Sequence, residues 1–283
     1  EAVIAGEELI LPAVCDPDPT REDGEEITAF GEHHGYQLNG KRRFVPLAGA
    51  ADAFLVDATV PDGTILCIVP RNSAGVTVEL SDQVDGGADG SVTFSGVTVI
   101  ADKLVAGASD GARLAGEIYD HLIIGAAAEM LGVMEQALEM TTDYMKTREQ
   151  FGRPIGKFQA LQHMAVDSHV AQELTRSLLY QVCAALDAGR GNRSMAAALK
   201  ARASDAVLAV TKTAIQLHGA IGFTDEYDAS LYLRRAMVLA ARHGNASRHR
   251  ARYARLVEAE TKATVEVSAK GRRKRKAKRK PSA

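Results

Sequence analysis

The chain has 283 residues, of which 46% are hydrophobic and 25% are charged. This balance is typical of a globular protein with one or two domains and a sizeable core. Aromatic residues make up only 5% and tryptophan is absent, so we expect an interior built mainly of Ala, Leu, Val and Ile. The three cysteines, Cys15, Cys67 and Cys183, are far apart and form no CxxC or Cys/His cluster. That spacing indicates neither a disulfide framework nor a metal site.

Charge is distributed unevenly along the chain. Residues 270–280, KGRRKRKAKRK, contain nine Lys and Arg and no acid, so a net charge of -2 leaves -11 for the remainder. Like charges at this density repel one another and bury no apolar surface, which predicts a disordered basic tail over 266–283. The tail is either a solvated end or a segment that binds nucleic acid or another anionic surface, and we favour the solvated end.

The sequence also bears on the cellular compartment. It contains no recognisable signal peptide and no apolar run long enough to cross a bilayer, so we expect a cytoplasmic protein without a membrane span.

Residues 1–108 are predicted to form a β-domain, either a barrel or a sandwich. Short runs rich in β-branched residues alternate with Gly, Pro, Asp and Asn. These runs are FLVDATV (54–60), TILCIVP (64–70), VTVEL (76–80) and SVTFSGVTVI (91–100). Asn39-Gly40, within YQLNGKRRF (36–44), predicts a hairpin turn between two strands.

Residues 109–265 are predicted to form an antiparallel helical bundle. Apolar residues recur at helical spacing in long Ala-rich segments, and the connections between these segments are short. The predicted helices cover 119–148, 158–189, 194–219, 226–244 and 246–264, and Gly189 and Gly219 are plausible stops. The resulting fold class is α+β, with the β-domain preceding the bundle and a boundary near 106–112.

Two segments of the helical half carry longer patterns. TREQFGRPIGKFQALQHMAVD (147–167) and QLHGAIGFTDEYDASLYLRRA (216–236) resemble segments of the acyl-CoA dehydrogenase family, the second its Gln-x-x-Gly-Gly-x-Gly-Phe segment. YQLNGKRRFVPLAGAADAFLV (36–56) resembles the hairpin that precedes the family's flavin-facing strand. The resemblance covers roughly residues 1–260. It implies the family's β-domain and C-terminal bundle. Family members begin with a further helical domain, so the chain either lacks that domain or is a fragment that starts at the β-domain.

The resemblance also implies a reaction and a cofactor. Family members remove the α-proton of an acyl-CoA thioester with a carboxylate while the β-hydrogen leaves as hydride to FAD. The family's arginine and glutamine in these segments contact the pyrophosphate and adenine end of a neighbouring subunit's FAD, and a guanidinium suits a diphosphate. The implied cofactor-binding residues are Arg148, Phe151, Phe158, Gln159, Gln216, Gly219 and Gly222. Alternatively, Arg148 caps a helix end and Gly219 only terminates a helix.

Three segments depart from the family pattern. The family's base, a Glu in a Tyr-Glu-Gly-Thr-like segment, corresponds to His243 when the chain is aligned on Gly244. The flavin-facing loop, Thr-Glu-Pro-Gly-x-Gly-Ser in the family, corresponds to LPAVCDPDPTRED (11–23), which lacks the glycines. The Trp-Ile-Thr-like strand corresponds to FVPL (44–47), in which a proline removes a backbone donor. The losses all fall on the side that holds the reactive ring.

The favoured interpretation is a non-catalytic subunit of a heteromeric bacterial acyl-CoA dehydrogenase. Its expected partners are a catalytic subunit, an acyl-CoA that is steroid-derived by family analogy, and an electron-transfer flavoprotein. A rival reading keeps catalysis in this chain, with Asp120 or His243 as the base. A third is a flavin-free structural or nucleic-acid-binding protein that uses the basic tail.

Overall fold

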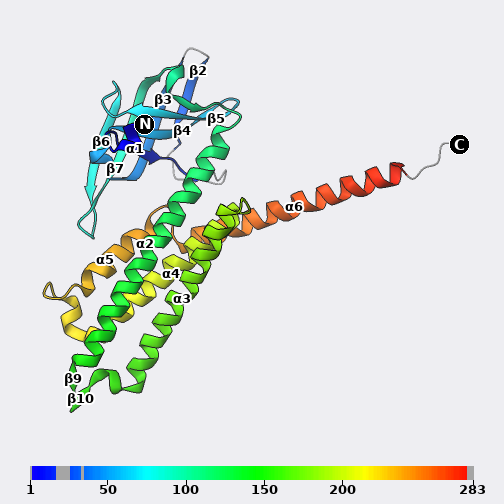
Figure 1. The fold of residues 1–283 in the computed structure, drawn as a ribbon. Coiled ribbons are helices and arrows are strands. Elements are labelled where there is room, and N and C mark those ends of the chain that lie inside the picture. The colour runs from blue at the N-terminus through cyan, green and yellow to red at the C-terminus, as the bar shows by residue number, and fades with distance from the viewer. Residues whose placement is uncertain (1, 17–25, 33–34, 279–283) are drawn as a thin grey trace.

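A computed structural model describes residues 2–16, 26–32 and 35–278, with side chains as far as Lys262 at the C-terminal end. In the described part of the chain, a β-domain comes first and a helical bundle follows (Figure 1). The strands and short helices of the β-domain are α1 (Ala2–Ala5), β1 (Ile10–Ala13), β2 (Thr28–Glu32), β3 (Gly35–Pro46), η1 (Ala48–Ala50), β4 (Ala53–Val60), β5 (Gly63–Pro70), β6 (Val76–Asp82), β7 (Ala88–Val99), η2 (Ala101–Lys103) and β8 (Leu104–Ala106).

The eight described strands of this domain belong to one sheet, in the order β6-β7-β3-β2-β4-β5-β8, with β1 paired to β4. Val92 and Phe94 of β7 share one buried core with Ile65 and Cys67 of β5. Because these strands lie far apart in the sheet order, the sheet must curve around that core. Apolar residues that alternate along the strands and point inward, as in β7, form this core.

The predicted hairpin at Asn39-Gly40 is wrong, because β3 runs straight through it from Gly35 to Pro46 and pairs with β7. A β-bulge falls between Leu38 and Asn39, and the Asn39 side chain accepts a hydrogen bond from the Gly96 backbone at 2.8 Å. A Cβ on Gly40 would lie 2.5 Å from the Glu26 carbonyl oxygen. The glycine therefore permits close strand approach where the sequence suggested a turn.

The bundle contains the five predicted helices. Its elements are α2 (Gly111–Thr147), β9 (Glu149–Gln150), β10 (Arg153–Pro154), η3 (Ile155–Lys157), α3 (Gln159–Asp187), α4 (Arg193–His218), η4 (Gly219–Phe223), α5 (Ala229–Ala241) and α6 (Ala246–Lys278). The Asn192 side chain caps α4 by accepting from the Met195 backbone at 2.9 Å. Gly219 ends α4 with φ 64°, a conformation that glycine adopts without strain.

Helix α4 lies at the centre of the bundle and contacts α2, α3, α5 and α6. Its apolar side chains, including Leu199, Val207 and Val210, join the main helical core. The stretch Arg193–Phe223 is long and apolar enough to cross a membrane by length and composition alone, which corrects the expectation that no such run exists. Half of its most apolar window is buried inside the protein, as in a core helix.

The ends of β8, α2 and α6 can be set beside the predicted domain limits. Strand β8 ends at Ala106 and α2 begins at Gly111, on either side of the predicted boundary at 108/109. Helix α6 continues to Lys278 and extends away from the bundle (Figure 1), although disorder was predicted from residue 266. Residues 279–283 lie outside the described residues, and the disordered tail remains a prediction.

Candidate functional site

The three segments that depart from the family pattern meet in one cleft between the β-domain and the bundle. The cleft has a volume of about 690 Å³ and is lined by residues 12–16, 42–46 and 242–245, among others. The part of the first segment from 17 to 23 lies outside the described residues. Tyr119 from α2 and Met237 from α5 complete the wall on the bundle side. Residues distant in sequence thus form one site of ligand size.

The β-domain side of the cleft is held by a buried arginine. Arg42 donates through Nε to the Ala13 carbonyl and through Nη2 to the Asp57 carboxylate, both at 2.9 Å. Phe44, two residues later, has a left-handed backbone with φ 56° and a 70% exposed side chain. Such a conformation costs a non-glycine residue about 1–3 kcal/mol and is found most often at functional sites.

The bundle side of the cleft is the turn between α5 and α6, which carries His243. The His243 backbone is also left-handed, with φ 56°. Its carbonyl oxygen accepts hydrogen bonds from Tyr119 Oη at 2.5 Å and His249 Nε2 at 2.8 Å. Burial, with nearby Arg242 and Lys200, lowers the pKa of His243 to about 4. A neutral imidazole of this pKa is a weak base at neutral pH.

Asp120 does not line the cleft but belongs to a buried ionic cluster next to it. Its carboxylate accepts from Arg252 Nη2 at 2.6 Å and lies 3.4 Å from Arg193 Nε. Arg252 also donates to Asp16 at 3.2 Å, which ties α6 to the β-domain. Burial raises the pKa of Asp120, and the two arginines oppose that rise. The carboxylate is thus already engaged in structural ion pairs.

A fully buried lysine supports the α5–α6 turn from behind. Lys200 of α4 is 0% exposed and donates to the carbonyls of Leu239, Ala240 and Gly244 and to the Ser204 hydroxyl. These carbonyls lie at and beyond the end of α5, where the helix offers them no partners of its own. Burial lowers the pKa of Lys200 to about 7. The lysine therefore fixes the segment that carries His243.

The residues that match the family lie at the opposite end of the bundle. Met145, Ile155 and Leu217 form a small core that joins the ends of α2, η3 and α4, with Phe158 packed against it. The rings of Phe151 and Phe158 are 6.1 Å apart and perpendicular. Four of the predicted cofactor residues at this end have exposed side chains, and they are Arg148, Phe151, Gln159 and Gln216.

The glycine-rich turn η4 completes this distal end. Gly219 is exposed and Gly222 is buried, with a Cβ at Gly222 placed 3.1 Å from the Ile215 carbonyl oxygen. The preceding His218 is 4% exposed and lies between Tyr144 and Tyr227, with ring centroids 4.5 and 4.7 Å away. Burial lowers the pKa of His218. An aromatic cluster thus holds the turn in place.

The structure also identifies residues that sequence reasoning missed. Two carboxylates line the cleft, Asp16 and Asp89, and Asp89 lies 3.3 Å from Arg242. Neither they nor Lys200 belong to a recognisable motif, so burial is the only signal and it requires the tertiary structure. In the described parts of the chain, no group of three or more His, Cys, Asp or Glu is arranged to hold a metal.

Comparisons with known proteins agree with this architecture. Residues 109–257 match the family model described as the acyl-CoA dehydrogenase C-terminal domain. An acyl-CoA dehydrogenase of Bacillus subtilis (strain 168) is 32% identical over 243 residues, which cover 83% of this chain and 64% of the relative. This chain therefore spans less than two thirds of that relative's length.

Solved structures of acyl-CoA dehydrogenases are also similar to this chain over most of its length. The ChsE4-ChsE5 complex from Mycobacterium tuberculosis matches with a TM-score of 0.81 and 28% identity, covering 91% of this chain and 68% of that one. The Tcur3481-Tcur3483 steroid ACAD G363A variant matches with a TM-score of 0.82 and 30% identity, covering 93% and 70%.

A sheet domain followed by an antiparallel bundle, with a cleft between them, places this chain among α+β proteins of the acyl-CoA dehydrogenase fold. The family match covers more than half of its residues, and the chain belongs to the acyl-CoA dehydrogenase family. Its relatives are oxidoreductases, and the family uses FAD.

Proposed function

We propose that this chain is a non-catalytic subunit of a FAD-dependent acyl-CoA dehydrogenase, one that contacts the ADP end of a neighbouring subunit's FAD. The observation that carries the proposal is the separation of its two sites along one helix. Tyr119 lines the cleft and Arg148 follows the far end of the same helix. At 1.5 Å per residue, the 29 intervening steps span about 44 Å. One small-molecule site cannot include both ends, which supports the proposal that the distal residues serve a ligand held by another chain.

The distal end suits the nucleotide part of FAD. The exposed Arg148 guanidinium can pair with a diphosphate in a bidentate manner, and the exposed Gln216 amide can donate to or accept from an adenine or ribose. Gly219 leaves the backbone open to close approach. Phe151 is 91% exposed and Phe223 76%, and side chains of this kind favour burial against a partner subunit.

The cleft fits a flavin ring poorly. The described residues that line it include no Ser or Thr, whereas the corresponding loop of the family provides hydroxyls to the ring. Pro46 offers no backbone donor. Arg42, Asp16 and Asp89 are committed to ion pairs. When bound at an interface with a partner, FAD would supply the redox chemistry, and this chain would bind, orient and shield its nucleotide end.

The rival reading, with a base in this chain, has less support. Asp120 is paired with two arginines and does not face the cleft. His243 does face the cleft, but its pKa of about 4 leaves it weakly basic. Among the described residues, the carboxylates that line the cleft are Asp16 and Asp89, and both are ion-paired.

The proposal extends to the partners that such a subunit needs. These are a catalytic acyl-CoA dehydrogenase subunit, an acyl-CoA substrate and an electron-transfer flavoprotein, in the cytoplasm. Two similar structures bear on this, because one is a ChsE4-ChsE5 complex and the other a Tcur3481-Tcur3483 steroid ACAD. We therefore propose a steroid-derived thioester as the first acyl group to test.

Co-expression with a catalytic family member tests the proposal. The chain is purified alone and with its partner, and flavin absorbance and acyl-CoA-dependent dye reduction are measured on both samples. The expected result is no flavin and no turnover alone, and about one FAD per heterodimer in the complex. Stoichiometric flavin with turnover by the lone chain would establish the rival reading. Nucleic-acid binding that is lost on deleting residues 270–283, together with no flavin in either sample, would favour a flavin-free structural or nucleic-acid-binding protein.

A further inference from the structure

The last helix of the bundle, α6, runs into a strongly basic segment, residues 270–280. The structure describes the backbone of this segment as helix as far as Lys278. Seven of the nine residues from 270 to 278 are Lys or Arg, and no Asp or Glu follows Glu266. The rest of the chain is acidic, so the cations of the molecule are concentrated at one end of one helix.

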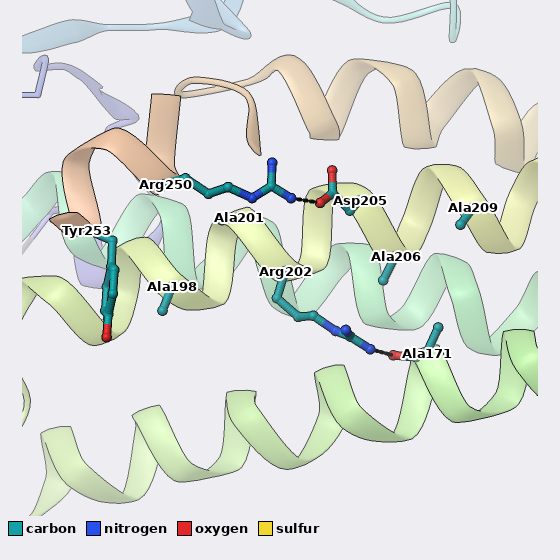
Figure 2. Close-up of a pocket in the computed structure, with 9 residues that line it drawn as sticks. All are labelled: Ala171, Ala198, Ala201, Arg202, Asp205, Ala206, Ala209, Arg250 and Tyr253. Atoms are coloured by element: carbon teal, nitrogen blue, oxygen red, sulfur yellow. Dashed lines mark hydrogen bonds and ion pairs between the residues drawn. The ribbon is translucent and has the colours of Figure 1, made fainter. Parts of the chain in front are cut away.

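The beginning of α6 is held firmly on the rest of the protein. Arg252 is 2% exposed and pairs with Asp16 of the β-domain and Asp120 of α2. Figure 2 shows a further ion pair, between Arg250 of α6 and Asp205 of α4. These contacts come from three different parts of the fold. They fix the direction in which α6 leaves the protein.

The basic segment lies well beyond the body of the protein. Among the described side chains of α6, the last that are partly buried are Leu256 and Val257, and those from 258 to 262 are exposed. From Val257 to Lys270 a helix rises about 20 Å, at 1.5 Å per residue. Helix α6 accordingly runs away from the bundle (Figure 1). Because the Debye length is about 8 Å at physiological ionic strength, salt screens the segment from the negative charge of the body.

The residue types of the segment limit the kind of anionic partner that it fits. From 268 to 280 the chain contains only Ser, Ala, Gly, Lys and Arg. Helices that lie on membranes insert Trp, Phe or Leu between the lipids. Proteins that bind single-stranded nucleic acid stack the bases on aromatic side chains. The segment has neither kind of residue, so its means of binding is charge.

The spacing of the charges matches duplex DNA. Seven cations in nine helical residues give one positive charge per about 1.9 Å of helix axis. Duplex DNA carries one negative charge per about 1.7 Å of its own axis. Successive residues of a helix are turned by about 100°, so the cationic residues are distributed around α6. The major groove of B-DNA, about 12 Å wide, admits a helix between two walls of phosphate, whereas a flat anionic surface meets one side of it.

We propose that the basic end of α6 binds the phosphate backbone of duplex DNA without selecting a base sequence. Contacts from Lys and Arg to phosphates position a helix on the duplex but carry no sequence information. The helix gives this segment what a disordered end lacks, a fixed direction away from the acidic body. The inference does not rest on the subunit role proposed above, because the distal end of the bundle and the end of α6 are separate parts of the molecule.

Salt-dependent binding of a fluorescent 20-base-pair duplex to the full chain, followed by anisotropy, tests the proposal. We expect a micromolar or lower dissociation constant at 50 mM salt, equal within twofold for two unrelated sequences. If five cations neutralise phosphates, the affinity falls about 20-fold between 50 and 100 mM salt. Deletion of residues 270–283 should weaken binding at least 50-fold. Circular dichroism confirms that the shortened chain is folded.

A pair of double variants makes the test specific to α6. Lys274→Gln with Lys276→Gln should lower the slope of log affinity against log salt by about 1.8, since each phosphate contact contributes about 0.9. Gln and Lys have similar helix propensities, so the helix is retained. Lys103→Gln with Lys212→Gln removes the same charge from exposed positions of the β-domain and α4 and should leave the slope unchanged.

Four results would overturn the proposal. The first is no binding by the full chain at 10 µM in 50 mM salt, and the second is undiminished binding after deletion of residues 270–283. The third is an equal loss of slope in the two double variants, which would place the contacts on the body. The fourth is tighter binding to vesicles with 30% phosphatidylserine, or to polyglutamate, than to the duplex, which would indicate a membrane or an acidic protein as the partner.

Discussion

Lys200 Nζ lies 2.9 Å from the carbonyl oxygen of Gly244, and this contact joins the central helix α4 to the turn that carries His243. The ammonium group also serves the carbonyls of Leu239 and Ala240. A cation at a helix C-terminus is favourable electrostatically. The contact therefore makes the wall of the interdomain cleft depend on a single buried amine.

Lys200→Met is expected to change how stability varies with pH. Burial lowers the pKa of Lys200 to about 7 in the folded chain, whereas in the unfolded chain it stays near the ordinary lysine value of 10.5. Between these values only the unfolded chain holds the proton, so this group makes stability rise with pH, by up to about 1.4 kcal/mol per unit. Urea unfolding at pH 6, 7.5 and 9 measures the effect. The free energy of unfolding of the wild type, minus that of the variant, should rise over that range. A constant difference would mean that Lys200 keeps its charge when buried.

His243 of the α5–α6 turn and His249 of the first turn of α6 are expected to lower the stability of the chain in the acid range. Burial is the main cause that lowers the pKa of His243 to about 4 and that of His249 to about 3. As pH falls from 6.5 towards 4, the unfolded chain takes up protons that the folded chain refuses, so stability falls. His249→Gln should flatten this part of the stability curve relative to wild type.

Asp120→Ala is expected to destabilise the chain by about 3–5 kcal/mol, because among the described residues it leaves the buried Arg252 with Asp16 as its one ion-pair partner. Glu117→Ala, on the same helix but in the exposed pair with Arg113, should change stability by less than about 1 kcal/mol. Chemical unfolding of both variants measures the contrast. Equal effects would show that the buried cluster does not hold α6 to the β-domain.

Arg148→Ala is expected to weaken FAD retention in the complex by roughly 1.5–3 kcal/mol, the value of a hydrogen bond to a charged group. The readout is the flavin dissociation constant after dilution or dialysis. Lys146→Ala is the control, since Lys146 is exposed near the same helix end and pairs with Asp143. Unchanged retention in the Arg148 variant would remove this residue from the site.

Gly40→Ala is expected to cost about 1–3 kcal/mol, because the new Cβ would lie 2.5 Å from the Glu26 carbonyl oxygen and 2.8 Å from Ile27 Cα. Gly125→Ala is expected to change stability in the opposite direction. Nothing lies within 4 Å of a Cβ at this exposed position of α2, so removing backbone freedom should stabilise the helix by about 0.5–1 kcal/mol. Thermal unfolding measures both variants, and a tolerated Gly40→Ala would contradict the close strand approach.

The helices were predictable because their signals are local. Apolar residues recur every three or four positions through α2, α3 and α4, and Gly219 ends α4 as a residue that adopts positive φ freely. The hairpin predicted at Asn39-Gly40 was wrong because the contacts that decide its structure are not local. The dipeptide is equally compatible with a turn and with a bulged strand, and its neighbours in β7 and at Glu26, distant in sequence, decide between them.

The sequence by itself determined the order of the two domains, the family, and the segments that keep or lose its pattern, because each is written in contiguous residues. Only the tertiary structure decided that the altered segments 12–16, 42–46 and 242–245 line one cleft, and that Arg148 lies at the far end of α2 from it. It also decided that Asp120 is paired and that Lys200 is buried. Burial and pairing depend on neighbours brought together by folding, and these set the charge and reactivity of a side chain.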